Sequence, residues 1–93
     1  MRFQIVTRPG TVGMSVTRIE DCVVVHAIAV HKSERRQGKA TQALRDLVEK
    51  SRQDGAKVLR VEAVYNWRLE ALLEKEGYVR QEEEDGSDWN LVL

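Results

Sequence analysis

Residues 35–40, Arg-Arg-Gln-Gly-Lys-Ala, bring cations and small residues together where an apolar strand pattern gives way to a helical one. From Gly38 onwards the apolar positions recur at helical spacing, so this segment leads into the first turn of a helix. The first backbone N–H groups of a helix lack partners, and the helix dipole favours negative charge there. The segment is therefore typical of an anion site, above all one for a phosphate group.

Two familiar phosphate loops do not fit this segment. A Walker P-loop needs a glycine five residues before its Gly-Lys pair and a Ser or Thr after it, whereas Ser33 and Ala40 occupy these positions. A dinucleotide-binding fingerprint needs three glycines, and only Gly38 is present. The loop therefore predicts a phosphate site of another kind.

Two side chains elsewhere in the chain could accept a proton. His26 interrupts the apolar run Val23–Val30, and Glu62 lies on a second apolar strand. Either could be a general base, because imidazole changes charge near neutral pH and a carboxylate accepts protons. The plainer interpretations are a hydrogen-bonded core histidine and an exposed strand residue. Cys22 is interpreted as a small core residue, and no metal site is expected because a lone cysteine cannot form one.

Composition limits the expected partners and location. Fifteen Lys and Arg residues balance fifteen Asp and Glu residues, so attraction to nucleic acid or to an anionic membrane is not expected. No apolar stretch approaches the roughly 20 residues that cross a bilayer, and the N-terminus lacks the apolar segment of a secretory signal. With one cysteine in 93 residues, the sequence predicts a single cytoplasmic domain spanning residues 1–93.

The elements that must position these residues follow from the spacing of apolar side chains. Strands are expected at residues 2–7, 14–19 and 22–30, forming an antiparallel meander. A helix is expected over residues 38–54, with Gly55 placed to end it in a left-handed conformation.

The second half of the chain predicts a further strand, a helix and a hairpin. The strand at 57–63 should lie parallel to the third strand, because a right-handed helical crossover joins them. Asn66 should cap a helix that ends at Gly77, and residues 78–81 and 89–93 should form a hairpin with an Asp-Gly turn. The predicted fold class is α/β, with a mixed, mostly antiparallel sheet in the order βββαβαββ.

The pattern Arg-x-x-Gly-x-Ala at Arg35–Ala40 resembles the pyrophosphate loop of the GNAT acyltransferase superfamily. The order of features downstream is also similar to that family: a helix, a strand, Asn66, a short helix ending in Glu-Lys-x-Gly-aromatic at Glu74–Tyr78, and a final hairpin. The resemblance covers about residues 13–93. It implies a GNAT-like sheet whose central parallel pair is splayed at the cofactor site.

The resemblance also implies that the chain transfers an acetyl group from acetyl-coenzyme A to a primary amine, by direct attack in a ternary complex. The acceptor would be a protein amine, a polyamine or an aminosugar. The backbone at the end of the central strand would pair with the pantetheine amides, and the N–H of Val30 would stabilise the oxyanion. The implied cofactor-binding residues are Ile28, Ala29, Val30, Arg35, Arg36, Gln37, Gly38, Lys39, Ala40, Thr41 and Asn66.

Departures from the family pattern leave two alternatives open. About 20 residues precede the central strand, so the family's lid helices are absent, and the acceptor groove should be open or completed in a homodimer. Leu73 occupies the position at which many members carry a tyrosine general acid. The first alternative is a non-catalytic regulatory module that binds coenzyme A or acyl-CoA. The second is a protein-interaction domain whose basic loop binds an anionic surface.

The acidic run Glu82–Asp85, together with Asp88, bears on the acceptor. In the family the last hairpin borders the acceptor opening, so this run predicts a cationic acceptor, although such a run is usually a solvated turn. Trp67 and Trp89 are interpreted as packing residues.

Overall fold

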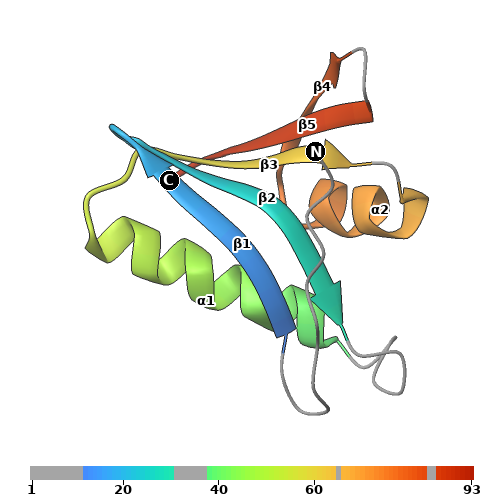
Figure 1. Ribbon diagram of the computed structural model, residues 1–93, viewed down its shortest axis with the longest axis horizontal. Coiled ribbons are helices and arrows are strands. Elements are labelled where there is room, and N and C mark those ends of the chain that lie inside the picture. The colour runs from blue at the N-terminus through green and yellow to red at the C-terminus, as the bar shows by residue number, and fades with distance from the viewer. Residues whose placement is uncertain (1–11, 31–37, 65, 84–85) are drawn as a thin grey trace.

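The computed structural model describes residues 12–30, 38–64, 66–83 and 86–93. The expected strand at residues 2–7 lies outside these ranges. The later elements are confirmed, with bounds that differ from the expected ones by a few residues. They are β1 (Val12–Ile19), β2 (Cys22–Val30), α1 (Lys39–Gln53), β3 (Val58–Val64), α2 (Trp67–Lys75), β4 (Val79–Glu83) and β5 (Gly86–Val92) (Figure 1).

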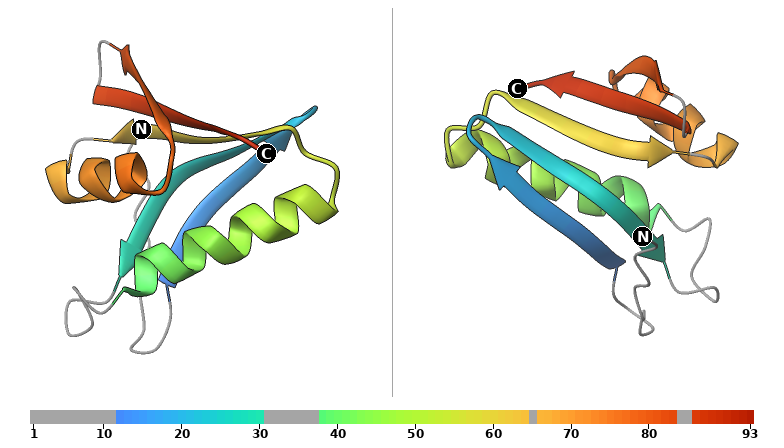
Figure 2. Two further views of the ribbon diagram at one scale, coloured as in Figure 1. Left: turned by 180° about the vertical axis from the view of Figure 1, so that it is seen from behind. Right: turned by 45° about the horizontal axis from the view of Figure 1, so that its top comes forward.

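The described strands form one sheet in the order β1-β2-β3-β5-β4. The central pair, β2 and β3, is parallel, and every other neighbouring pair is antiparallel. The predicted mixed, mostly antiparallel sheet is therefore confirmed. Helix α1 forms the crossover that connects the parallel strands β2 and β3. Helix α2 connects β3 to β4, which is the edge strand, and β5 lies between β3 and β4 in the sheet (Figure 2).

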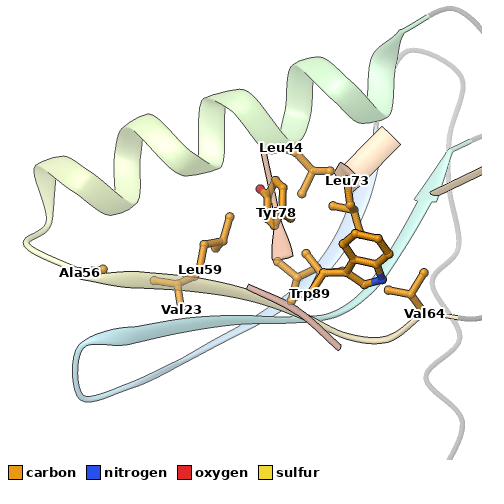
Figure 3. Packing of buried hydrophobic residues seen from close by; sticks show 10 residues of the cluster. Val23, Leu44, Ala56, Leu59, Val64, Leu73, Tyr78 and Trp89 are labelled. Atoms are coloured by element: carbon orange, nitrogen blue, oxygen red, sulfur yellow. The ribbon is translucent and has the colours of Figure 1, made fainter. Parts of the chain in front are cut away.

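Both helices pack on the same face of the sheet, which we call the helix face. Leu44 from α1 and Leu73 from α2 are at most 1% exposed and belong to one apolar cluster (Figure 3). Arg45 on α1 also donates two hydrogen bonds to the Glu76 carboxylate just after α2, and these bonds lower the pKa of Glu76. The buried cluster contains Val23, Val25, Leu44, Ala56, Leu59, Val61, Val64, Leu73, Tyr78 and Trp89.

The helix ends lie where the sequence predicts them. Gly55 follows α1 with a φ of 81°, and Gly77 follows α2 with a φ of 91°, a conformation that costs glycine little. The Asn66 side chain accepts a hydrogen bond from the Arg68 N–H at 2.9 Å, which confirms Asn66 as the cap of α2. In the described part of the chain, no helix is both long and apolar enough to cross a membrane.

The two tryptophans have different environments. Trp89 is 4% exposed, and its indole N–H donates to the hydroxyl of the buried Ser87, so its predicted packing role is confirmed. Trp67 is 69% exposed at the start of α2, and its predicted packing role is wrong. The apolar spacing of α2 did not reveal this, because the first residue of a helix can point away from the buried stripe.

The phenol of Tyr78 is the one buried side-chain group without a hydrogen-bond partner among the described residues. The residue is 5% exposed, and burial, with a smaller contribution from the Glu76 carboxylate, raises the pKa of Tyr78 to about 12. A buried hydroxyl that makes no hydrogen bond costs the desolvation of that group, about 1–3 kcal/mol.

We therefore expect Tyr78→Phe to raise the free energy of unfolding at pH 7 by about 1 kcal/mol. Above pH 10 the unfolded chain loses the phenolic proton that the folded chain keeps until about pH 12. The stability of the wild type should consequently fall relative to that of Tyr78→Phe by up to about 1.4 kcal/mol per pH unit over this interval. Urea denaturation of the wild type and of Tyr78→Phe at pH 7, 10 and 11 measures this difference. A phenylalanine variant less stable than the wild type would contradict the prediction.

Candidate functional site

The two parallel strands at the centre of the sheet, β2 and β3, pair through their backbones along only about half of their length. Residues of β2 and β3 are in register from Cys22 and Val58 to Val25 and Val61. Beyond these positions the two strands diverge towards their C-terminal ends (Figures 1 and 2). The backbone of the second half of β2 therefore has no partner on β3 in the described structure. We call this region the split.

Each of the two central strands bulges where the split begins. The register between β1 and β2 shifts so that His26 is the extra residue, and the register between β3 and β5 shifts between Val61 and Val64. A bulge reverses the alternation of side chains along a strand. Val61 and Val64 consequently both join the core despite their odd spacing, and the same holds for Val25 and Ile28.

Two polar side chains of β2 and β3 point to the face opposite the helices. Because Val25 and Val61 point to the helix face, the next residues, His26 and Glu62, point to the other face. The bulge of β2 has no signature in the sequence, because side-chain alternation cannot be read from a strand that is apolar on both faces. His26 is the one polar residue that interrupts the apolar run of β2, whereas both Arg60 and Glu62 interrupt that of β3.

A groove of about 610 Å³ lies between the end of β2 and the starts of α1 and α2. Eight of the eleven predicted cofactor-binding residues line it, although they come from three separate segments. The other three, Arg35, Arg36 and Gln37, lie outside the described residues. The groove is lined by Ile28, Ala29, Val30, Gly38, Lys39, Ala40, Thr41, Asn66, Arg68, Leu69 and Leu72.

The α1 side of the groove presents backbone amides. Gly38 has φ 73° and ψ 10°, and a Cβ placed on it would meet no atom of the other described residues within 4 Å. The first helical hydrogen bond runs from the Gln42 N–H to the Gly38 carbonyl, so the amides of residues 39–41 precede it. No acidic side chain lies in this turn. Open space, amides and the positive end of the helix dipole together fit a phosphate group.

The α2 side of the groove contributes an amide and a cation. The Asn66 side-chain oxygen caps the helix, while its Nδ2 makes no hydrogen bond among the described residues, so capping leaves a donor for a ligand. The Arg68 guanidinium lies 5.2 Å from the centre of the exposed Trp67 ring. Three further groove residues on α2 were not predicted, because apolar periodicity indicates which side chains are buried and not which ones line a groove. They are Arg68, Leu69 and Leu72. An arginine two positions after the cap was the available signal.

The two candidate bases lie together at the closed end of the split. His26 Nδ1 lies 3.0 Å from Glu62 Oε2, so their side chains bridge the strands where backbone pairing stops. His26 Nε2 lies 3.0 Å from the Thr17 hydroxyl on β1. The side chains of His26 and Glu62 are 23% and 37% exposed. These contacts agree with the plainer interpretation of His26 as a hydrogen-bonded histidine, and the role of either residue as a base stays a prediction.

Val30 lies at the other end of the split. Four residues of extended strand, about 13 Å, separate it from His26. The structure therefore brings Val30 together with the α1 amides and does not bring it together with the candidate bases. Its assignment as oxyanion donor stays a prediction.

Several other predicted features lie away from the groove. Leu73 is fully buried in the core and supplies no acid. Cys22 begins β2, at the end remote from the groove, and its thiol contacts only its neighbour's carbonyl at 3.9 Å among the described contacts. Residues 84 and 85 of the acidic run lie outside the described residues. Within the described ranges, no group of three or more His, Cys, Asp or Glu residues could hold a metal ion.

Comparison with known proteins agrees with this architecture. A family model described as the acetyltransferase (GNAT) family matches residues 9–78. This match covers most of the sequence, and the chain therefore belongs to the GNAT acetyltransferase family. No curated protein gives a significant match to the chain.

Several solved structures share the fold. A Bacillus subtilis acetyltransferase in complex with CoA has a TM-score of 0.69 and 22% identity, over 86% of this chain and 66% of that one. The ribosomal-protein-S18-alanine N-acetyltransferase of Escherichia coli has a TM-score of 0.73 and 21% identity, over 94% and 64%. A Drosophila melanogaster polyamine N-acetyltransferase has a TM-score of 0.63 and 16% identity, over 77% and 44%. The chain thus spans about two thirds of the first two proteins and less than half of the third.

Proposed function

We propose that this chain binds acetyl-coenzyme A in the groove and transfers the acetyl group to a primary amine by direct attack in a ternary complex. One observation carries the proposal. Predicted cofactor-binding residues from β2, α1 and the cap of α2, which are far apart in sequence, line a single groove beside the split. The complex of the B. subtilis relative with CoA supports the same ligand.

The groove offers groups for each part of the ligand. The amides of residues 39–41 and the open space at Gly38 would hold the pyrophosphate. The second half of β2, which β3 does not cover, would pair with the pantetheine amides. Acetyl-coenzyme A supplies an activated thioester. Ile28, the groove residue nearest the bulge, is better placed than Val30 for its N–H to face that thioester at the closed end of the split.

Proton transfer would take place on the opposite face of the sheet. An amine becomes a nucleophile only after it loses its proton, and the His26–Glu62 pair lies at the closed end of the split with solvent access. Cys22 lies at the other end of β2, so an acetyl-cysteine intermediate has no support and direct attack is preferred. The Glu62 carboxylate also favours a cationic acceptor.

The relatives support an amine acceptor without defining which one. By their names, one acts on an alanine of a ribosomal protein and another on polyamines. Both acceptors are amines. The proposed class of acceptor is therefore a protein amine, a polyamine or an aminosugar. We also propose that residues 1–93 form a single domain with a cytoplasmic location. A homodimer would cover the acceptor side.

One observation favours the non-catalytic alternative, a module that binds coenzyme A or acyl-CoA. Leu73 is fully buried where the family pattern has a tyrosine acid, so no side chain replaces that acid at this position. A thiolate with a pKa near 8.5 leaves without strong acid assistance, and this loss therefore slows turnover without forbidding it.

Two measurements test the proposed function. Calorimetry with acetyl-coenzyme A should give saturable one-to-one binding, and absence of binding would refute both the enzyme and the non-catalytic module. The release of the coenzyme A thiol should then be measured with four acceptors. Three are cationic, namely spermidine, a peptide with an N-terminal alanine, and glucosamine, and the fourth, glutamate, is the anionic comparison. Turnover that favours the cationic acceptors supports the proposal. Binding without thiol release from any amine would support the module.

Arg68 provides a separate test of the groove. Arg68 lines the groove, and its guanidinium would pair with a phosphate of the ligand, an interaction of about 1.5–3 kcal/mol. We expect Arg68→Ala to weaken acetyl-coenzyme A binding about tenfold or more, as measured by calorimetry. Arg52→Ala, which removes a cation from the far end of α1, should leave the affinity within twofold. Equal affinities for wild type and Arg68→Ala would remove Arg68 from the site.

A further inference from the structure

Three side chains form a continuous hydrogen-bonded chain on the face of the sheet opposite the helices. Glu62 of β3 contacts His26 of β2, and His26 contacts Thr17 of β1, each at 3.0 Å. The three residues come from three adjacent strands. The chain therefore crosses the split at its closed end and continues to a strand that the predicted site did not include.

The chemistry of the three groups determines where the imidazole proton lies. An ionised carboxylate only accepts hydrogen bonds, so Nδ1 of His26 must donate to Glu62 Oε2. A neutral imidazole then has its lone pair on Nε2, and a threonine hydroxyl can donate to it. Thr17 thus stabilises the tautomer in which His26 faces Glu62 with an N–H group.

The same arrangement distinguishes between the two candidate bases. The basic nitrogen of His26 is occupied by the Thr17 hydroxyl, so it cannot directly accept a proton from an amine. Glu62 has a second oxygen, Oε1, with no hydrogen bond among the described residues, and its side chain is the more exposed of the two. An ammonium group needs such an acceptor.

We propose that Glu62 is the proton acceptor for the amine, and that His26 and Thr17 are positioning residues that orient its carboxylate. This inference rests on the proposed function and extends it to a residue of β1. The N–H of His26 fixes one carboxylate oxygen, which leaves the other directed to the acceptor. Thr17 acts through His26 by keeping the ring in the required tautomer and orientation. In the reaction Glu62 Oε1 takes one proton from the ammonium group, and the freed amine lone pair forms the carbon–nitrogen bond at the acetyl carbon. The carbon–sulfur bond breaks with its electron pair on sulfur, so that coenzyme A leaves as a thiolate, and the second nitrogen proton passes to that thiolate.

Matched variants of Thr17 test this proposal. Thr17→Val removes the hydroxyl and keeps the shape, whereas Thr17→Ser keeps the hydroxyl, and Thr17 is exposed, so neither should disturb the core. We expect Thr17→Val to lower kcat about tenfold, a part of the 10²–10⁴-fold that a positioned base contributes. The KM for acetyl-coenzyme A should stay within twofold, and Thr17→Ser should restore kcat to within threefold of the wild type.

A second measurement is independent of activity. Long-range ¹H–¹⁵N correlation spectra of the ring nitrogens distinguish the protonated from the unprotonated nitrogen of a neutral histidine. The chain has only one other histidine, so a His31→Gln variant assigns the His26 signals. We expect the Nδ1–H tautomer in the wild type and in Thr17→Ser, and a loss of that single tautomer in Thr17→Val.

The outcomes are separable. An Nε2–H tautomer in the wild type, or ring signals that Thr17→Val leaves unchanged, would overturn the positioning role. Unchanged kcat in Thr17→Val would do the same. A wild type that binds acetyl-coenzyme A but acetylates no amine would instead refute the proposed function and the catalytic role of Glu62, while the spectra would still decide whether Thr17 fixes the ring.

Discussion

Replacing Gly38 with glutamate should weaken acetyl-coenzyme A binding by at least about 100-fold. The new side chain would enter the space beside Gly38 that no atom of the other described residues fills, at the turn where the amides of α1 begin. Its carboxylate would lie within a few ångströms of the pyrophosphate, and two like charges about 4 Å apart repel by about 4 kcal/mol at an effective dielectric constant of 20. Calorimetry measures the loss directly.

Gly55→Glu is the matched control for this substitution. Gly55 has a φ of 81° against 73° for Gly38, and a Cβ on either glycine meets no atom within 4 Å. Both variants therefore introduce the same charge and the same backbone strain, of about 1–2 kcal/mol, at opposite ends of α1. Only Gly38→Glu should lose the ligand. Equal affinity in the two variants would show that the groove at α1 is not the pyrophosphate site.

Glu62→Gln should lower kcat by about 100-fold or more, because the amide cannot accept a proton whereas its oxygen can still accept the His26 hydrogen bond. The affinity for acetyl-coenzyme A should be unchanged, since Glu62 does not line the groove. Steady-state kinetics with a saturating amine, combined with calorimetry, separates the two quantities.

Glu74→Gln serves as the control for charge, because this exposed carboxylate on α2 lies outside both the groove and the hydrogen-bonded chain. Its kcat should remain within twofold of the wild type. A Glu62→Gln variant with a kcat equally close to the wild type would refute Glu62 as the base, and His26 would then be the remaining candidate of the two.

Local patterns predicted the order of the elements well. Strand β2 has the predicted bounds, and α1 and α2 begin at the predicted glycine and asparagine, because these residues fix the backbone locally. The central parallel pair followed from a general rule of chain topology. Eight of the eleven predicted cofactor-binding residues also line the groove, because the family resemblance specified three separate segments of the chain in the correct order.

The acceptor side could not be predicted in the same way. Thr17 is one of several polar residues on an alternating strand, and nothing in its neighbours distinguishes it. Its contact with His26 depends on how β1 pairs with β2, and this pairing leaves no local signal. The exposure of Trp67 and the role of Arg68 likewise depend on how α2 is rotated against the sheet, which the sequence pattern gave only approximately.

The split in the sheet has a consequence for how the two ligands would arrive. A continuous sheet is a barrier, and reactants on its two faces cannot meet. Here β2 and β3 are not paired beyond Val25 and Val61, with the groove on the helix side and the Thr17–His26–Glu62 chain on the other. Donor and acceptor would therefore approach from opposite directions, and neither would obstruct the departure of the other. Approach from opposite faces of the sheet favours random binding order, in which either ligand can be first to bind and first to leave.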